Sequence, residues 1–200
     1  MNRFTDDNFG LTWLMDSFHA DWSNYAGSEG EVVENSLWGG LDPRHVMLLR
    51  RDAVSLLEQL PVASVEQLWE SGIEVSDFFG RRVQSGDQWM RIIIERCDEW
   101  LSQGEGASLG EADREEGFVH SGAVLGELGR SIEILGSDLV SELEKCARRC
   151  SPDLAFRFLL QALERRGERI AKPRYERLAE IGSNLRYGEF LVSRLEHLVA

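Results

Sequence analysis

Residues 17–22, with the sequence SFHADW, place a histidine and an aspartate between two aromatic side chains. Histidine and carboxylate side chains are the groups that ligate metals or exchange protons. On a continuous helix each residue turns by about 100°, so His19 and Asp21 lie about 200° apart. They then cannot reach a common ion unless the helix ends between them.

Aromatic residues surround this stretch at steps of four and five, which predicts one broad face of a helix. They are Phe9, Trp13, Phe18 and Trp22. We therefore expect them to seat the first helix on the core and Asp21 to cap the segment that follows. A metal-dependent enzyme using His19 and nearby carboxylates is the less favoured alternative.

No other motif in the chain indicates catalysis. The remaining histidines form no zinc-protease pattern, and no glycine pattern for nucleotide phosphates or serine elbow is present. Cys146 and Cys150 lie one helical turn apart, but zinc needs further ligands at recognisable spacing, so we expect these thiols and Cys97 to be reduced and structural. The sequence predicts no catalytic residue, no cofactor and no metal, and hence no enzyme.

The charge is acidic and unevenly spread. The chain has 35 acidic and 22 basic residues, for a net charge of −13, of which −10 falls in residues 1–104 and −3 in residues 105–200. Such a field repels nucleic acid and anionic membranes and attracts basic proteins, so we expect a basic protein partner and neither nucleic acid nor membrane. The alternative is that the charge only confers solubility.

Nothing in the sequence predicts secretion or a membrane span. No apolar run approaches about 18 residues, and no basic segment followed by an apolar run opens the chain. We expect a cytoplasmic protein.

The helical pattern predicts an all-α antiparallel bundle, with two packed helical subdomains as a variant. In the first half, helices are expected over 42–60, from a capping box at 64–67 to residue 72, and from 86 or 87 to 101. In the second half, an apolar stripe runs over 128–146, and further helices follow Ser151, Pro173 and Gly188. Period-two alternation, the mark of a strand, is nowhere sustained.

A Gly-rich, acidic stretch at 105–117 lacks apolar periodicity and is expected to be a linker or long loop. It divides the chain into an acidic helical region, 1–104, and a C-terminal helical region, 118–200. Whether these are separate domains or one continuous bundle is left open.

The candidate partner-binding residues lie between the first two helices, in an acidic segment punctuated by glycine. They are Tyr25, Glu29, Glu31, Glu34 and Trp38. Aromatic side chains beside acids are suited to anchor a basic partner. The alternative is an ordinary solvated loop.

The stretch LMDSFHADWSNYAGSEGEVVE resembles the start of a family of immunity proteins from bacterial contact-dependent growth inhibition systems. Phe18, His19, Asp21 and Trp22 match the Phe-His-x-Asp-Trp signature, and VMLLRRDAVSLLEQ is similar to the helix that follows it. The resemblance covers about the first 100 residues.

The resemblance implies a protein that binds the C-terminal domain of its cognate toxin in the cytoplasm and occludes the active site. Such toxins are often nucleases and hence basic. Contacts with the toxin are expected to differ between members, so the shared signature is interpreted as structural. The alternative function is a helical interaction or scaffold module without a toxin partner.

Overall fold

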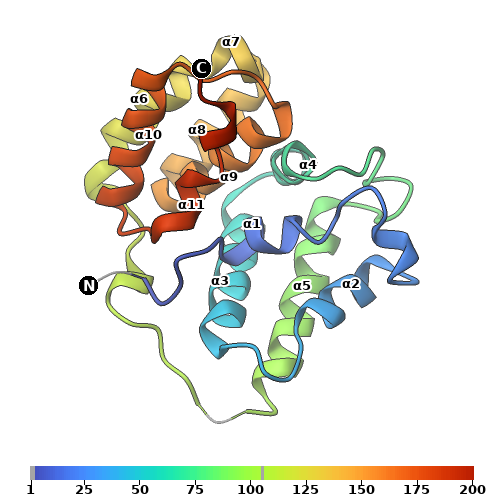
Figure 1. Cartoon of the computed structure of the whole chain (residues 1–200). Helices are drawn as coiled ribbons and strands as arrows, with labels where there is room; N and C mark the ends of the chain where they lie inside the picture. The colour runs from blue at the N-terminus through green and yellow to red at the C-terminus, as the bar shows by residue number, and fades with distance from the viewer. Residues whose placement is uncertain (1–2, 105) are drawn as a thin grey trace. The chain divides into compact units, whose positions relative to one another are not determined.

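Helices are the regular elements of the described chain. The computed structural model describes residues 3–104 and 106–200, and these ranges contain α-helices and short 3-10 helices but no β-strand (Figure 1). Two isolated bridges, Phe79 with Val83 and Ile170 with Val199, are the strand-like pairings found there. The all-α prediction is confirmed.

The described residues divide into two compact units. One comprises residues 9–109 and is called here the acidic unit; the other joins residues 3–8 to 110–200 and is called the discontinuous unit. The acidic unit has 17 acidic and 7 basic residues, a net charge of −10, while the discontinuous unit carries −3. Most of the charge excess therefore belongs to one unit.

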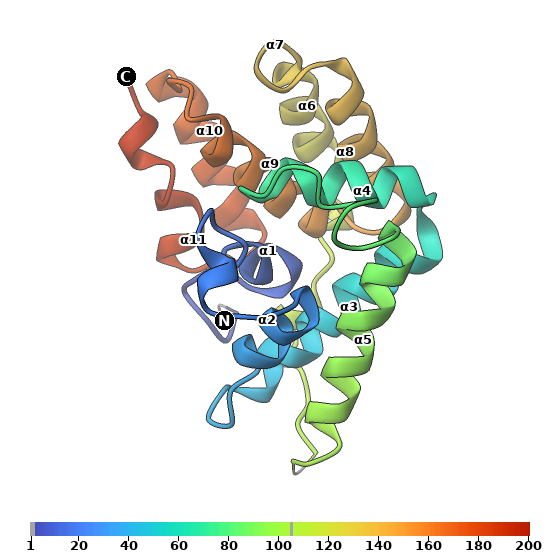
Figure 2. The same ribbon diagram turned by 90° about the vertical axis from the view of Figure 1, so that its right-hand side faces the viewer.

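The described residues of the acidic unit form five α-helices and one 3-10 helix. They are α1 (Gly10–Met15), η1 (Trp22–Asn24), α2 (Glu29–Ser36), α3 (Pro43–Gln59), α4 (Val62–Gly72) and α5 (Gly86–Leu101). Figures 1 and 2 show α3 and α5 side by side and antiparallel, and this pair makes the most extensive helix contact in the unit. The shorter helices α1, α2 and α4 pack against it.

Helix α3 follows its local sequence signals. The Asp42 side chain accepts the backbone N–H of Arg44 at 2.9 Å, and Pro43 occupies the first turn, where its missing N–H is not needed. Val46, Leu49, Ala53 and Leu56 are buried on one face, as the spacing predicts. The start of α5 at Gly86 is also as predicted.

Helix α4 begins earlier than expected. Pro61 is its N-cap and the helix starts at Val62, so the capping box at 64–67 is not formed. Instead Ser64 lies in the first turn, is buried, and donates its backbone N–H to the Pro61 carbonyl at 2.9 Å. The extended conformation of Pro61 already directs the chain into the helix, so the cap falls at the proline.

The discontinuous unit is built around a buried helix. Its α-helices are α6 (Ser121–Arg130), α7 (Ile132–Leu135), α8 (Ser137–Arg149), α9 (Pro152–Arg166), α10 (Lys172–Asn184) and α11 (Glu189–Ser193), and its 3-10 helices are η2 (Ala112–Arg114), η3 (Phe118–His120) and η4 (Glu196–Leu198). Every residue over 151–163 is buried, and α9 packs on α6, α7 and α8. Helix α9 begins after its N-cap Ser151 and ends at the left-handed Gly167 (φ 65°), both where the sequence predicts.

The apolar stripe over 128–146 is divided among three helices. A turn at Ser131 separates α6 from α7, and Gly136, at φ 84°, separates α7 from α8. The Ser131 hydroxyl donates to the Glu127 carbonyl at 2.8 Å, which stabilises the turn. Because the chain bends twice, Ile132 is exposed although it continues the apolar spacing.

A buried ion network ties the first residues of the chain to α9. The Arg3 guanidinium contacts the Asp153 carboxylate at 2.7 Å and donates to the carbonyls of Leu185 and Glu115. Arg157 reaches the other Asp153 oxygen at 3.0 Å, and both arginine side chains are fully buried. Residues 3–8 thus belong with the C-terminal helices, whereas their position in the sequence predicted that they belong to the 1–104 region.

The expected linker 105–117 is partly folded into the discontinuous unit. Residue 105 lies outside the described residues, and 106–109 have no regular structure. From residue 110 the chain belongs to the discontinuous unit and forms η2. The buried Asp113 carboxylate accepts the backbone N–H of Phe4 at 3.0 Å, so this stretch also packs on the first residues.

Candidate interaction surface on the acidic unit

The five residues singled out from the sequence all lie on or next to α2. Tyr25 precedes the helix, Glu29, Glu31 and Glu34 lie within it, and Trp38 follows it. The structure therefore brings them into one region of the acidic unit. We call this region the α2 surface.

Residues 29–36 form helix α2, whereas the composition predicted an acidic segment punctuated by glycine, with an ordinary solvated loop as the alternative. The Ser28 hydroxyl accepts the backbone N–H of Glu31 at 3.2 Å, and the Glu31 carboxylate reaches back to the N–H of Gly27 at 2.7 Å. This is close to a capping box, and the Ser-x-x-Glu spacing at 28–31 is the signal that could have predicted the helix. The buried Val32 and Val33 then hold the helix on the unit.

Two of the three glutamates form ion pairs with arginine. Glu29 lies 3.6 Å from Arg82, and Glu34 lies 2.9 Å from Arg96, which also contacts Glu99 at 2.7 Å. Sequence spacing gives no sign of these pairs, because both arginines come from later segments of the chain. The α2 surface is thus an acidic face with interspersed arginines rather than a uniform anionic patch.

Tyr25 is an ordered but exposed aromatic residue. Tyr25 is 74% exposed. The centre of its ring lies 6.1 Å from the centre of the His19 ring, and the two rings meet edge-on. Its carbonyl accepts a hydrogen bond from the Asn35 amide of α2 at 3.4 Å. These contacts hold the backbone of Tyr25 to the helix while its ring stays accessible.

Trp38 is exposed at the other end of α2. The residue is 59% exposed, and its ring lies so close to Gly40 that a Cβ atom there would come within 2.3 Å of the ring. The Leu41 N–H donates to the Trp38 carbonyl at 3.0 Å and closes a turn. The glycine thus allows the indole to lie over the backbone of its own turn.

The SFHADW stretch is not part of an α-helix, and only its last residue, Trp22, lies in the 3-10 helix η1. Helix α1 ends at Met15, so the aromatic residues do not form one helix face as expected. Phe18 and Trp22 are nevertheless buried, and they anchor the segment after α1 rather than the helix itself. The Phe18 ring lies 5.5–5.7 Å from four other rings, those of Trp22, Trp69, Phe78 and Trp89.

His19 and Asp21 point outward from this aromatic cluster and are exposed. The His19 Nδ1 atom accepts the backbone N–H of Asp21 at 3.3 Å, while the Asp21 side chain does not cap η1. Within residues 3–104 and 106–200, no three His, Cys, Asp or Glu side chains gather as a metal site would require.

Hydrogen bonds to Glu74 fix the loop that carries His19. The Glu74 N–H donates to the Phe18 carbonyl at 3.1 Å, and the Glu74 carboxylate accepts the N–H of Ala20 at 3.0 Å. The hydrogen bonds to Glu74 hold the backbone of the loop, and the buried side chains of Phe18 and Trp22 fix the loop to the core.

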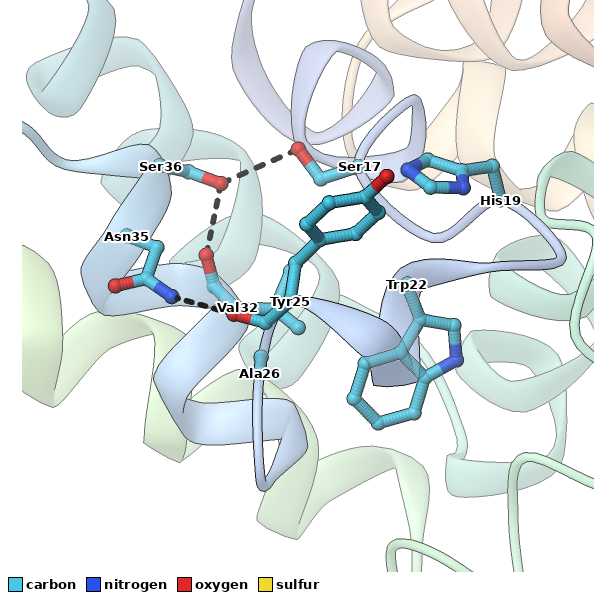
Figure 3. Close-up of a pocket in the computed structure, with 8 residues that line it drawn as sticks. All are labelled: Ser17, His19, Trp22, Tyr25, Ala26, Val32, Asn35 and Ser36. Carbon is cyan, nitrogen blue, oxygen red and sulfur yellow. Dashed lines mark hydrogen bonds between the residues drawn. The ribbon is translucent and has the colours of Figure 1, made fainter.

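A pocket opens between this loop and α2 (Figure 3). Its volume is about 200 Å³, and it is lined by Ser17, His19, Trp22, Tyr25, Ala26, Val32, Asn35 and Ser36. In Figure 3 the Tyr25 ring extends towards Ser17 and His19, and the two serine hydroxyls face each other. We call it the Tyr25 pocket.

Two further hollows border α2. One, of about 240 Å³, lies at its C-terminal end between Glu34, Arg96 and Trp100, and another, of about 420 Å³, lies between its N-terminal turn and α5. The α2 surface therefore combines exposed aromatic rings with concave spaces, which are the features of a protein-binding face.

The cysteines are buried thiols. Cys97, Cys146 and Cys150 are all buried, and none of them forms a disulfide in the described part of the chain. Burial raises the pKa of Cys97 to about 12, so its thiol stays protonated near neutral pH and is a poor nucleophile.

No protein-family model, no curated protein and no solved structure matches the chain. Among the helices in the described part of the chain, none is both long and apolar enough to cross a membrane.

Proposed function

We propose that this chain is an immunity protein that binds a basic toxin domain through the α2 surface and occludes the toxin's active site. The observation that carries the proposal is the pair of exposed, ordered aromatic residues, Tyr25 and Trp38, at the two ends of an acidic helix. The resemblance of residues 14–34 to immunity proteins of contact-dependent growth inhibition supports the same function.

Charge and shape have separate roles in this mechanism. The net charge of −10 on the acidic unit attracts a basic domain and accelerates the encounter. The aromatic rings then provide the buried contacts that hold the complex, because Tyr and Trp are enriched among the residues that dominate interface energies. An interface of standard size, roughly 1,600 Å² in total, is enough to cover an active site.

Inhibition in the cytoplasm requires no chemistry from the chain itself. A toxin that acts on nucleic acid presents cationic residues to its substrate, and the carboxylates of α2 compete for those residues. The toxin loses activity because the substrate can no longer enter.

Co-expression with the toxin domain encoded by the adjacent gene tests the function. Cells that produce both proteins are expected to survive, and the two proteins are expected to purify as a complex that weakens as salt is raised. Two outcomes would refute the proposal. One is cell death although the chain is abundant and folded, and the other is that the purified chain captures no basic polypeptide from its own operon.

A matched pair of variants tests the surface. The double substitution Tyr25→Ser with Trp38→Ser is expected to weaken toxin binding at least 100-fold, since each truncated anchor of this kind costs about 2 kcal/mol or more. The control is Phe118→Ser with Phe190→Ser, which removes two aromatic residues of similar exposure from the discontinuous unit. If the control weakens binding as much as the test pair, the α2 surface is not the interface.

A further inference from the structure

We propose that the Tyr25 pocket receives an arginine side chain of the partner. The inference rests on the proposed function only in that the arginine belongs to a basic protein. It assigns an occupant to a pocket that the sequence did not indicate.

The size of the pocket is that of one side chain. Its volume of about 200 Å³ falls below the roughly 300–1,000 Å³ of pockets that hold small molecules and cofactors. It is open at the surface of α2, beside an exposed ring, where a side chain from another protein can enter.

Aromatic rings form the walls and favour a cation. Trp22, Tyr25 and His19 all line the pocket. Arg82 is not among the lining residues, but its Cζ atom lies 5.0 Å from the centre of the Trp22 ring, so this ring already accepts a guanidinium from the chain itself. Cations bind the faces of aromatic rings, and arginine does so more often than lysine. The Tyr25 ring, largely exposed, offers a second such surface.

The hydroxyls in the pocket are arranged to accept hydrogen bonds. Ser36 Oγ donates its single proton to the Val32 carbonyl at 2.8 Å. In the 3.2 Å contact between the two serine hydroxyls, the proton must therefore come from Ser17. Both lone pairs of Ser17 Oγ are then available as acceptors, and a complementary ligand has to supply an N–H donor.

Two acidic residues adjoin lining residues in the sequence without lining the pocket themselves, and the negative charge of the unit favours a charged donor over a neutral one. Asp21 lies in the loop between His19 and Trp22, and Glu31 precedes Val32 and is held towards Gly27 by its hydrogen bond. The acidic unit as a whole carries −10. A planar guanidinium with five N–H donors meets the rings and the acceptors together, whereas an ammonium cannot stack.

The site is also ordered before binding. The reciprocal bonds between Glu74 and the 18–20 backbone, together with the aromatic cluster around Phe18, hold the loop in place. A ligand therefore does not have to order the loop, and even a single amino acid is expected to bind measurably.

The test is an NMR titration of the full-length chain with N-acetyl-arginine amide, N-acetyl-lysine amide and N-acetyl-citrulline amide. Citrulline has nearly the shape of arginine but no charge. We expect saturable shifts of His19, Tyr25 and Ser36 with the arginine compound, with a dissociation constant on the order of millimolar. The lysine compound is expected to bind at least threefold more weakly, and the citrulline compound at least tenfold more weakly.

Two variants and a control locate the effect. Tyr25→Leu and Ser17→Ala are each expected to weaken arginine binding at least threefold. Phe118→Leu, which changes an exposed ring of the discontinuous unit outside the lining, is expected to leave it unchanged. Equal binding of citrulline and arginine would overturn the inference, as would arginine-induced shifts that leave these residues unaffected.

The NMR titration does not need the toxin, so it tests the pocket separately from the proposed function. A chain that binds arginine in the pocket but does not protect cells would refute the proposed function alone. A chain that neutralises the toxin but shows no arginine-specific shifts would refute the pocket assignment alone.

Discussion

At the residue scale, the SFHADW stretch shows how neighbouring side chains are divided between core and surface. Phe18 and Trp22 enter the aromatic cluster, while His19 and Asp21 between them face solvent. The two buried residues hold the loop, and the two exposed residues are presented beside α2. The same six residues therefore contribute both to stability and to the candidate surface.

Substitutions at adjacent positions test this division. Phe18→Ala is expected to lower the free energy of unfolding by about 3–5 kcal/mol, because it leaves a cavity among four aromatic rings. His19→Ala is expected to change it by no more than about 0.5 kcal/mol, because the side chain is exposed. Urea denaturation followed by circular dichroism measures both, and similar losses for the two variants would contradict the division.

The orientation of these residues could not be obtained from spacing alone. Periodicity predicted a helix through Phe18 and Trp22, but α1 ends at Met15. Three of the four rings around Phe18 come from residues 69, 78 and 89, and contacts so distant in sequence leave no mark on local periodicity. The sequence did predict that these aromatic residues are buried, since burial depends on residue type.

At the element scale, glycine decides where helices stop. Gly136 has φ 84° and ψ 156°, a conformation that is nearly restricted to glycine, and it separates α7 from α8. Gly129 lies inside α6 with ordinary helical geometry, and a Cβ added at either position meets no atom within 4 Å. Any difference between alanine substitutions at the two sites therefore reflects backbone conformation rather than packing.

Gly136→Ala is expected to destabilise the discontinuous unit by about 1–3 kcal/mol, because alanine is strained in this conformation. Gly129→Ala is expected to stabilise it by about 0.5–1 kcal/mol, because glycine loses more conformational freedom in a helix than alanine does. Thermal unfolding of the two variants and the unsubstituted chain provides the comparison. Changes of the same sign would show that the junction tolerates another backbone geometry.

Helix boundaries were predictable where the residues that start or stop the helix are next to each other in the sequence. Asp42–Pro43, Ser151–Pro152 and Gly167 each mark an end of a helix in the structure as in the sequence. Ser28 and Glu31 carried an equally local signal for α2, which the acidic, glycine-rich composition around them obscured.

At the scale of the whole molecule, the sequence of the acidic unit is inserted between the two sequence segments that form the discontinuous unit. Residues 3–8 join 110–200 through the buried pair of Arg3 and Asp153, which lie 150 positions apart in the chain. Tyr187 donates its hydroxyl to the Asp153 carbonyl at 3.1 Å, and burial raises the pKa of Tyr187 well above its ordinary value. Arg3 is thus part of the core of the discontinuous unit.

Arg3→Met tests this arrangement. It is expected to lower the stability of the discontinuous unit by about 3 kcal/mol, near the low end for breaking a buried ion pair, because Arg157 still contacts Asp153. Arg44→Met, which breaks a solvent-exposed pair with Asp42, is expected to cost no more than about 1 kcal/mol.

Hydrogen exchange read by mass spectrometry assigns the loss to a unit. With Arg3→Met, protection is expected to fall over 121–166 and to remain unchanged over 43–101. Equal loss of protection in both ranges would contradict the division into two units with residues 3–8 in the second.

The sequence by itself determined the helical fold, most of the helix ends with capping signals and the concentration of negative charge before residue 110. These properties depend on residue type and on neighbours within one or two helical turns, so they are legible without the tertiary structure. Only the tertiary structure decided that residues 3–8 belong with α9, that arginines 82 and 96 neutralise part of α2, and that a pocket forms beside Tyr25. Each of these requires groups from distant parts of the chain to meet, and which groups meet is decided by how the helices pack.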